Sequence, residues 1–381
     1  MKVGILTLYY KNNNYGGQLQ AYALQKFLED RSIQCEQISF QKTDNKINQY
    51  KKRKLSMMKL IKNRIWRMCN IVVYIKAKER WRNFEKFSNS IPHSKYIYTS
   101  QNITDSINSY DTFVCGSDQI WSDKWSDREE QLVYCLDFVD GKKKIAYAAS
   151  IGANELNSEH ADLLKKSLEK FNSISVRESS AKILIDEIIS KDIKTVLDPT
   201  LLLSANDWNN VCVETKKSKE EPYIFAYLLG MNRQQREAVT DIAKELKLKL
   251  WTIPYVFGSM RTCDLGFGDI KDYSSGPAEF IGLIKNADLI LTDSFHAMVF
   301  SVIYHKQFYV FKRDSDNNPK SMNSRIVDFL TELGLKKRLV NSNFIESIDI
   351  KSNIDYKEVD EVLEKKREIS IEFLNKALNT N

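Results

Sequence analysis

The chain has 381 residues, of which 43% are hydrophobic and 11% aromatic, a composition that excludes a disordered protein. This length exceeds that of one ordinary core and predicts two domains with a cleft between them. No apolar run approaches the ~18 residues that a membrane span needs. The opening "MKVGILTLYY" is followed by "KNNNYGG" and lacks a small-residue cleavage site, so it is interpreted as a first strand and not as a signal peptide.

Positive charge is concentrated in one segment. Residues 46–86 contain 14 lysines and arginines and two acids, a net charge of +12 in a chain whose total is +7, so the remainder carries −5. This distribution excludes a general nucleic-acid binder. The apolar residues of the segment fit an amphipathic helix, and such a cationic helix suits an anionic membrane surface. Docking on the acidic remainder of the protein, or plain solvent exposure, are the alternatives.

The cysteines are scattered and form no C-x-x-C pair. This pattern predicts reduced thiols in a cytosolic protein and no zinc site. The six are Cys35, Cys69, Cys115, Cys135, Cys212 and Cys263.

The N-terminal half alternates between strands and helices. "VGILTLYY" predicts a buried strand, "QLQAYALQKFLEDRS" a helix with apolar residues at helical spacing, and "IQCEQISF" a second strand. Further strand-then-helix pairs follow in "YDTFVCGSDQIWS", with a strand over Thr112–Cys115, in "KKKIAYAASIG" with its helix "SEHADLLKKSLEKF", and in "SISVRESSAKILIDEI". This order predicts a Rossmann-like parallel sheet within residues 1–205, with a basic helical insertion over 46–90.

A second series begins after the charged linker "ETKKSKEE". Strands are predicted in "PYIFAYLLG", "LKLWTIPY", "DLILTDS" and "QFYVFK", with helices between them. They indicate a second Rossmann-like domain over 220–345, and a terminal helix over 355–381 that is expected to return across the junction. The fold class is therefore α/β, with two Rossmann-like domains facing across a cleft.

Polar residues cluster just after the predicted strands, where open α/β sheets bind ligands. "NYGG" lacks the full dinucleotide pattern, and a tight strand-to-helix turn is its simplest interpretation. "GSDQIW", flanked by Trp121 and Trp125, has the hydrogen-bonding groups and aromatic faces of a sugar site, although a helix cap explains it equally well. The candidates for binding a sugar acceptor are Asn14, Tyr15, Gln18, Ser117, Asp118, Gln119 and Trp121.

Two arginines and a histidine suggest an anion site. Arg177 directly follows a strand and Arg325 starts a helix, and a guanidinium there binds either a carboxylate or phosphate ligand or an internal acid such as Glu178 or Asp198. His296 lies in the first turn of a helix after a strand. Metal ligation is disfavoured because no second ligand stands at metal-binding spacing.

Several blocks together resemble the polysaccharide pyruvyl transferase family. They occur in family order across residues 3 to about 335: "NYGGQLQAYAL", "YDTFVCGSDQIW", "IAYAASIG", "SVRE", "VLDPTLLL", "TDSFHAMVFS" and "NSRI". The resemblance implies a GT-B-like architecture. It also implies transfer of the carbons of phosphoenolpyruvate onto two hydroxyls of a sugar, forming a cyclic ketal and releasing phosphate, with no cofactor.

The family motifs assign roles to individual residues. The resemblance makes His296 and Arg177 catalytic, and assigns donor binding to Arg177, Arg325, Ser294, His296 and Lys312. Better-known members carry an arginine two residues before the histidine, where this chain has Ser294. The second positive charge must then come from elsewhere, and Arg325 and Lys312 are the candidates.

The family also suggests the setting of the reaction. Its acceptors are often lipid-linked saccharides, which fits a cytoplasmic protein, peripheral on the inner membrane face, with contact through 46–86. A GT-B glycosyltransferase using a nucleotide sugar, and a non-catalytic glycan-binding protein on the same fold, are the alternative functions.

Overall fold

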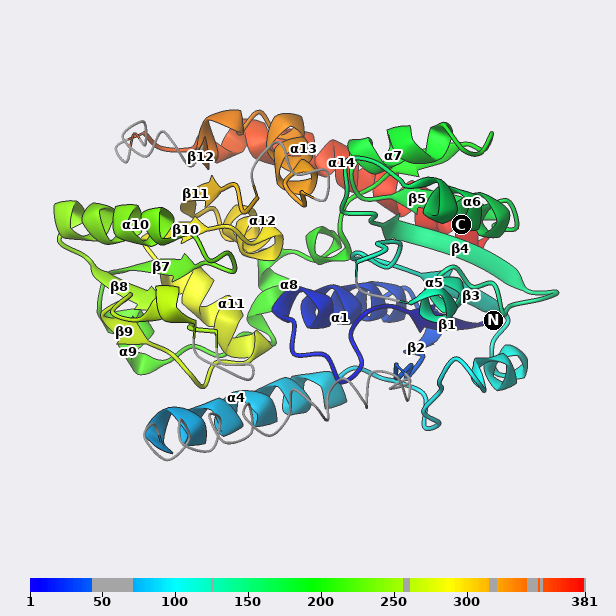
Figure 1. The fold of residues 1–381 in the computed structure, drawn as a ribbon, viewed down its shortest axis with the longest axis horizontal. Helices are drawn as coiled ribbons and strands as arrows, with labels where there is room; N and C mark the ends of the chain where they lie inside the picture. Colours follow the sequence, from blue (N-terminus) through cyan, green and yellow to red (C-terminus); the bar gives the residue numbers. More distant parts are fainter. Residues whose placement is uncertain are drawn as a thin grey trace.

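Two six-stranded sheets make up the two halves of the molecule (Figure 1). The computed structural model describes residues 1–42, 71–124, 127–255, 261–314, 321–340, 349 and 352–379. The strand orders are β2-β1-β3-β4-β5-β6 and β12-β11-β10-β7-β8-β9, and all pairings between these strands are parallel. The predicted fold class, with two Rossmann-like α/β domains, is confirmed.

The N-terminal sheet is built from short apolar runs. In β1, Val3, Ile5 and Leu6 are fully buried, as expected for a parallel strand covered on both faces. Strand order reverses between β1 and β3, and the loops after these two strands open at the crevice where such sheets bind ligands. The strands are β1 (Lys2–Leu6), β2 (Gln34–Gln37), β3 (Thr112–Cys115), β4 (Lys143–Ala149), β5 (Ser173–Val176) and β6 (Ile193–Thr195).

The C-terminal sheet repeats this design, with its reversal between β7 and β10. The loops after these strands, with Leu229 and Asp293, therefore lie at the second crevice. The strands are β7 (Tyr223–Tyr227), β8 (Lys249–Thr252), β9 (Ile270–Lys271), β10 (Leu289–Thr292), β11 (Gln307–Phe311) and β12 (Leu339–Val340).

Helices connect the strands in both domains. The segment "ETKKSKEE", expected to be a linker, contains the short helix α9, which Thr215 caps by accepting from the Ser218 amide. The helices are α1 (Tyr15–Glu29), α4 (Ile71–Asn89), α5 (Arg128–Tyr134), α6 (Ser158–Leu168), α7 (Ser179–Asp186), α8 (Ala205–Asn209), α9 (Lys216–Glu220), α10 (Arg233–Leu246), α11 (Pro277–Asn286), α12 (Phe295–Ile303), α13 (Ser324–Glu332) and α14 (Tyr356–Leu378).

Helix α14 ties the domains together. It starts against the C-terminal domain, where the Tyr356 hydroxyl donates to the Lys306 carbonyl at 2.5 Å, and it ends on the N-terminal domain (Figure 1). There the Ser370 hydroxyl accepts from the Leu197 amide at 2.9 Å, and Lys143 donates to the Ala377 carbonyl at 3.0 Å. The terminal helix thus returns across the junction.

Helix α4 runs along the opposite side of both domains (Figure 1). Its buried Arg80 donates to the carbonyls of Pro254 and Asp272 in the C-terminal domain, while Phe87 packs against Tyr22 of α1. This part of the basic segment therefore docks on the protein itself; residues 43–70 lie outside the described ranges. In the part of the chain that is described, no helix is long and apolar enough to cross a membrane.

Replacing Ser370 by alanine should destabilise the protein. The hydroxyl is fully buried, so its loss leaves the Leu197 amide without an acceptor, at a cost of about 1–3 kcal/mol in the free energy of unfolding. Urea denaturation measures this change. Ser158→Ala, at the exposed start of α6, is the matched control and should stay within about 0.5 kcal/mol. Equal changes in the two variants would contradict the anchoring role of Ser370.

Candidate functional site

A cleft of about 650 Å³ opens where the crevices of the two sheets face each other. Its walls come from the loops after β1, β3 and β7, the first turn of α12, the residues after β11 and the start of α13. It is lined by Leu8, Asn12, Asn14, Lys42, Asp118, Gln119, Leu229, Tyr255, Arg261, Ser294, Phe295, His296, Arg313, Met322 and Arg325.

His296 reaches from the C-terminal domain into the N-terminal one. Its ring lies against Gly16 in the first turn of α1, so closely that a Cβ on Gly16 would stand 1.9 Å from Nδ1. On the other side, Nε2 is 3.6 Å from Asp198 Oδ2. The glycine of "NYGG" is thus needed to make room for an imidazole, in addition to starting a helix.

Asp198 is a buried carboxylate surrounded by donors. Oδ1 accepts from the amide and hydroxyl of Thr200, and Oδ2 accepts from Arg177 at 2.7 Å and lies 3.2 Å from the Ser117 hydroxyl oxygen. Burial works to raise the pKa of Asp198, but the interaction with His296, the charge of Arg177 and the Thr200 hydrogen bond outweigh it and hold this pKa well below its usual range. Asp198 is therefore an anion.

Arg177 lies behind the cleft wall. Besides Asp198, it faces Glu178 at 3.5 Å and Asp118 at 3.6 Å, and its side chain is only 3% exposed. Burial works to lower the pKa of Arg177, but Asp198, Glu178 and Asp118 together raise it. Of the two partners considered for Arg177, an external anion or an internal acid, the structure contains the internal acids Asp198 and Glu178.

Arg325 lines the cleft and shares an aromatic ring with Arg177. Their guanidinium carbons lie 5.7 Å and 4.4 Å from the centroid of Phe295. Burial, followed by the charge of Arg177, lowers the pKa of Arg325 to about 10, so it remains positively charged at neutral pH. Its ion-pair partner, the carboxylate of Asp118, is 4.0 Å away. Because this pairing is long, Arg325 can bind an external anion.

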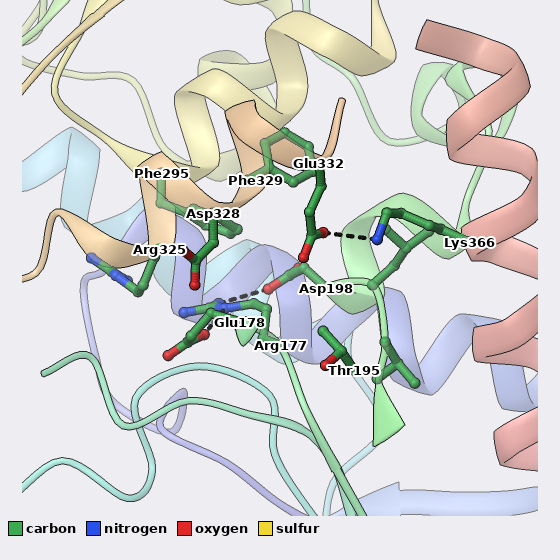
Figure 2. Close-up of a pocket in the computed structure, with 12 residues that line it drawn as sticks. Arg177, Glu178, Thr195, Asp198, Phe295, Arg325, Asp328, Phe329, Glu332 and Lys366 are labelled. Carbon is green, nitrogen blue, oxygen red and sulfur yellow. Dashed lines mark hydrogen bonds and ion pairs between the residues drawn. The ribbon is translucent and has the colours of Figure 1, made fainter. Parts of the chain in front are cut away.

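Figure 2 shows the wall behind these arginines, around a small pocket of about 20 Å³. Arg177 and Asp198 come from the N-terminal domain, and Phe295 and Arg325 from the C-terminal one. Farther back, Lys366 of α14 pairs with Glu332 of α13 at 2.9 Å. Residues of both domains and of α14 line this pocket. The pocket therefore belongs to the junction between the domains and not to the open cleft.

Arg313 is a cleft residue that the sequence analysis missed. It follows β11, and its Nη2 donates to the Asp293 carbonyl at 2.9 Å, beside Ser294. The Asp293 carboxylate, 3.7 Å from Arg313, accepts from the amides of Leu229 and Gly230 and so fixes the loop after β7. Its position just after a strand could have identified this arginine from the sequence as a cleft residue. The same signal led to its neighbour Lys312, which does not line the cleft.

Arg261 is a second missed cation. Its guanidinium stacks 3.8 Å from the Tyr255 ring centroid and hydrogen-bonds the Leu229 carbonyl. It stands six residues after the predicted strand "LKLWTIPY" and not directly at the end of that strand, so the strand-end rule did not point to it. Together with Arg313 and Arg325 it makes the cleft strongly cationic.

Apart from Lys312, the predicted site residues separate into a group that lines the cleft and a group that lies in the interior. Asn14, Asp118, Gln119, Ser294, His296 and Arg325 line the cleft. Ser294 caps α12, its hydroxyl accepting from the Ala297 amide at 3.4 Å. Trp125 lies outside the described residues. The others lie in the interior: Arg177, Tyr15, Gln18, Ser117 and Trp121.

Each interior residue of the predicted acceptor set has an internal contact. The Tyr15 hydroxyl donates to the Ser275 carbonyl at 2.6 Å, and Gln18 donates to the carbonyls of Tyr9 and Asn12. Ser117 donates to the Ala148 carbonyl, and Trp121 packs against Phe171. These side chains shape the loops behind the cleft. Across the described ranges, no group of three or more His, Cys, Asp or Glu residues is arranged to hold a metal ion.

The fold and cleft define a two-domain α/β protein of the GT-B-like class. Similar solved structures include a UDP-GlcNAc 2-epimerase of Methanocaldococcus jannaschii with UDP-GlcNAc and UDP (15% identity, TM-score 0.50, covering 96% of this chain and 94% of that one) and the S. aureus MnaA-UDP structure (12%, TM-score 0.53, 100% and 97%). A third is a putative UDP-N-acetylglucosamine 2-epimerase of Listeria monocytogenes (11%, TM-score 0.51, 97% and 91%). At these identities the likeness shows the fold alone.

The sequence shows which family the chain belongs to. The model of the polysaccharide pyruvyl transferase family matches residues 14–315, so the chain belongs to that family. No curated protein sequence matches the chain.

Gly16→Ala should displace the His296 ring, because the new Cβ would lie 1.9 Å from Nδ1. NMR of the ring protons of the four histidines measures the effect, and the His296 signals should move while those of His93, His160 and His305 stay. Gly141→Ala is the control: it has open space and a φ of +65°, so it should cost about 1 kcal/mol of stability and leave His296 unchanged. Unmoved His296 signals in Gly16→Ala would refute the close packing.

Proposed function

We propose that the protein transfers pyruvate from phosphoenolpyruvate to two hydroxyls of a sugar in a surface-glycan precursor. The main support for this proposal is the positive charge of the cleft. Arg261, Arg313 and Arg325 line it together with the first turn of α12. Among its described lining residues, Asp118 is the single carboxylate. Phosphoenolpyruvate, with a carboxylate and a phosphate, matches this excess of guanidinium groups. Family membership supports the same reaction.

The reaction replaces phosphate by two oxygens of the sugar. The methylene carbon gains a proton, which makes the neighbouring carbon electrophilic, and a sugar hydroxyl forms a C–O bond to it and gives up its proton. A second hydroxyl then forms the other C–O bond and gives up its proton while the C–O bond to phosphate breaks. Of the two hydroxyl protons released, one balances the proton gained by the methylene carbon and the other leaves with the phosphate. The products are a cyclic pyruvate ketal and inorganic phosphate, so proton transfer at the reacting atoms is the chemistry that the protein must supply.

The donor site is proposed at the C-terminal wall. Arg325 and Arg313 bind the two anionic ends of the donor, and the free amides of the first turn of α12 face the phosphate. Ser294 caps that helix, while Arg313 supplies the positive charge that better-known family members carry at the position of Ser294. His296 exchanges protons with the reacting groups, and Arg177 acts behind it through Asp198.

The acceptor site is proposed at the N-terminal wall. Asn14, Asp118 and Gln119 offer hydrogen-bonding groups to sugar hydroxyls, and the Tyr255–Arg261 stack borders them across the cleft. A carboxylate such as Asp118 is suited to accept a hydrogen bond from an attacking hydroxyl.

Membrane contact is proposed through the outer face of α4. Ile71 and Ile75 are 60% and 59% exposed there, next to the exposed Lys76 and Lys78. Apolar residues flanked by lysines support contact with an anionic lipid surface. This arrangement suits an acceptor that is linked to lipid.

Phosphate release tests the reaction. The protein is incubated with phosphoenolpyruvate and lipid-linked saccharides, phosphate is measured, and mass spectrometry seeks a saccharide carrying a pyruvate ketal. Acceptor-dependent phosphate release together with the ketal is expected. Turnover of UDP-sugars with no phosphate release would instead establish a glycosyltransferase, and saccharide binding without turnover of either donor would establish a glycan-binding protein.

Arg313→Gln should raise KM for phosphoenolpyruvate about 10- to 100-fold, because a charged hydrogen bond contributes about 1.5–3 kcal/mol. Steady-state kinetics with phosphate detection measures the change. Lys312→Gln is the matched control: it removes the same charge one residue away, outside the cleft lining, and should change KM little. A larger effect at Lys312 than at Arg313 would overturn the proposed donor site.

A further inference from the structure

We infer that Asp198 is a positioning residue that holds His296 in the tautomer with the proton on Nε2, leaving Nδ1 to exchange protons in the cleft. The tautomer follows from geometry alone. Its catalytic consequence rests on the proposed function.

The environment of Nε2 favours a proton on that atom. Nε2 is buried and has no hydrogen-bond partner within 3.5 Å among the described residues, while Asp198 Oδ2 stands 3.6 Å away. A carboxylate oxygen can only accept, so a lone pair on Nε2 would face a second lone pair. A proton on Nε2 instead points to an anion.

Asp198 cannot turn away from the ring, because both of its oxygens are held. Thr200 donates two hydrogen bonds to Oδ1, and Arg177 donates to Oδ2, with the Ser117 hydroxyl 3.2 Å away. Figure 2 shows the Arg177 guanidinium directed at this carboxylate. Breaking one hydrogen bond of a buried ion is costly, so the acceptor that faces His296 is fixed in place.

The opposite side of the ring leaves Nδ1 for the substrate. Nδ1 packs beside Gly16, whose missing side chain makes room for the ring, and the His296 side chain, 9% exposed, lines the cleft. Nε2 is the ring nitrogen that is buried without a partner. The nitrogen available to a ligand is therefore Nδ1.

The pair is assembled from both domains. Asp198 follows β6 of the N-terminal sheet, and His296 belongs to α12 of the C-terminal domain. The tautomer is thus set only while the domains are together. Other charged groups of the described residues also surround this junction. They are Arg177, Glu178 and Asp118 of the N-terminal domain, Arg313, Arg325, Asp328 and Glu332 of the C-terminal domain, and Lys366 of α14.

The proposed reaction gives this arrangement a use. The sugar hydroxyl passes its proton to Nδ1 as the C–O bond forms, and the resulting imidazolium keeps its Nε2 proton directed at Asp198. The Nδ1 proton then passes to the phosphate oxygen as phosphate leaves. Asp198 stabilises the imidazolium and never takes up the proton.

The test is ¹⁵N NMR of the full chain with labelled histidine. Four histidines give four pairs of ring signals, and His296→Gln assigns the pair of interest. In the neutral form of the ring, its nitrogens should show Nε2 protonated and Nδ1 unprotonated. A spectrum of the wild-type protein with Nδ1 protonated would overturn the inference, whatever the enzyme does with phosphoenolpyruvate.

Asp198→Asn extends the test. Two Thr200 donors keep the amide oxygen at the Oδ1 position, so the new NH₂ group faces His296 and should move the proton to Nδ1. With phosphoenolpyruvate and acceptor, kcat should fall about 10²- to 10⁴-fold, the contribution typical of a general acid or base, while KM for phosphoenolpyruvate changes little. An unchanged tautomer in a folded Asp198→Asn protein would contradict the inference; if that variant does not fold, the wild-type spectrum still decides.

His305 is an internal control in the same spectra. Its Nε2 pairs with Asp360 at 3.0 Å on the exposed surface, far along the chain from Asp198. The tautomer signals of His305 should stay unchanged in Asp198→Asn. A shift in all four histidines would indicate a general loss of structure and not a change at the pair.

Discussion

The buried ion pair between Arg177 and Asp198 is the constraint on which the rest of the site depends. A guanidinium that is 3% exposed is tolerated only where carboxylates compensate its charge, and here Asp198, Glu178 and Asp118 surround it. These acids come from the ends of different strands of one sheet. The pair therefore fixes the loops after β3, β5 and β6 relative to one another, and Asp118 and Gln119 enter the cleft from the first of these loops.

The same ion pair also contacts the C-terminal domain, through His296 and Phe295. His296 reaches Asp198 only because Gly16 leaves room for its ring, and Phe295 places its ring under the guanidinium groups of both Arg177 and Arg325. Helix α14 then crosses from Tyr356 on one domain to Ser370 on the other. The cleft is thus set by contacts behind it, and its own lining remains available for ligands.

The sheets could be predicted from sequence because buried parallel strands are continuous apolar runs, such as Thr112–Cys115. The rule that ligands bind after strand ends also led to Asp118, Gln119 and His296. It could not tell which way a side chain turns: Gln18 and Trp121 follow strands yet face the interior, and Lys312 was chosen where Arg313 lines the cleft. Those directions depend on packing between segments far apart in the chain, which no local pattern records.

Charge repulsion links ligand binding to the junction. Arg325 lies beside Arg177, and this neighbouring charge, after burial, lowers the pKa of Arg325. Asp118 is shared by the two guanidinium groups at 3.6 Å and 4.0 Å, too far for a hydrogen bond to either. An anion bound by Arg325 would relieve this repulsion and strengthen the contact between α13 and the N-terminal domain. Because His296 meets Asp198 at the same junction, binding of an anion would also stabilise the contact between these two residues.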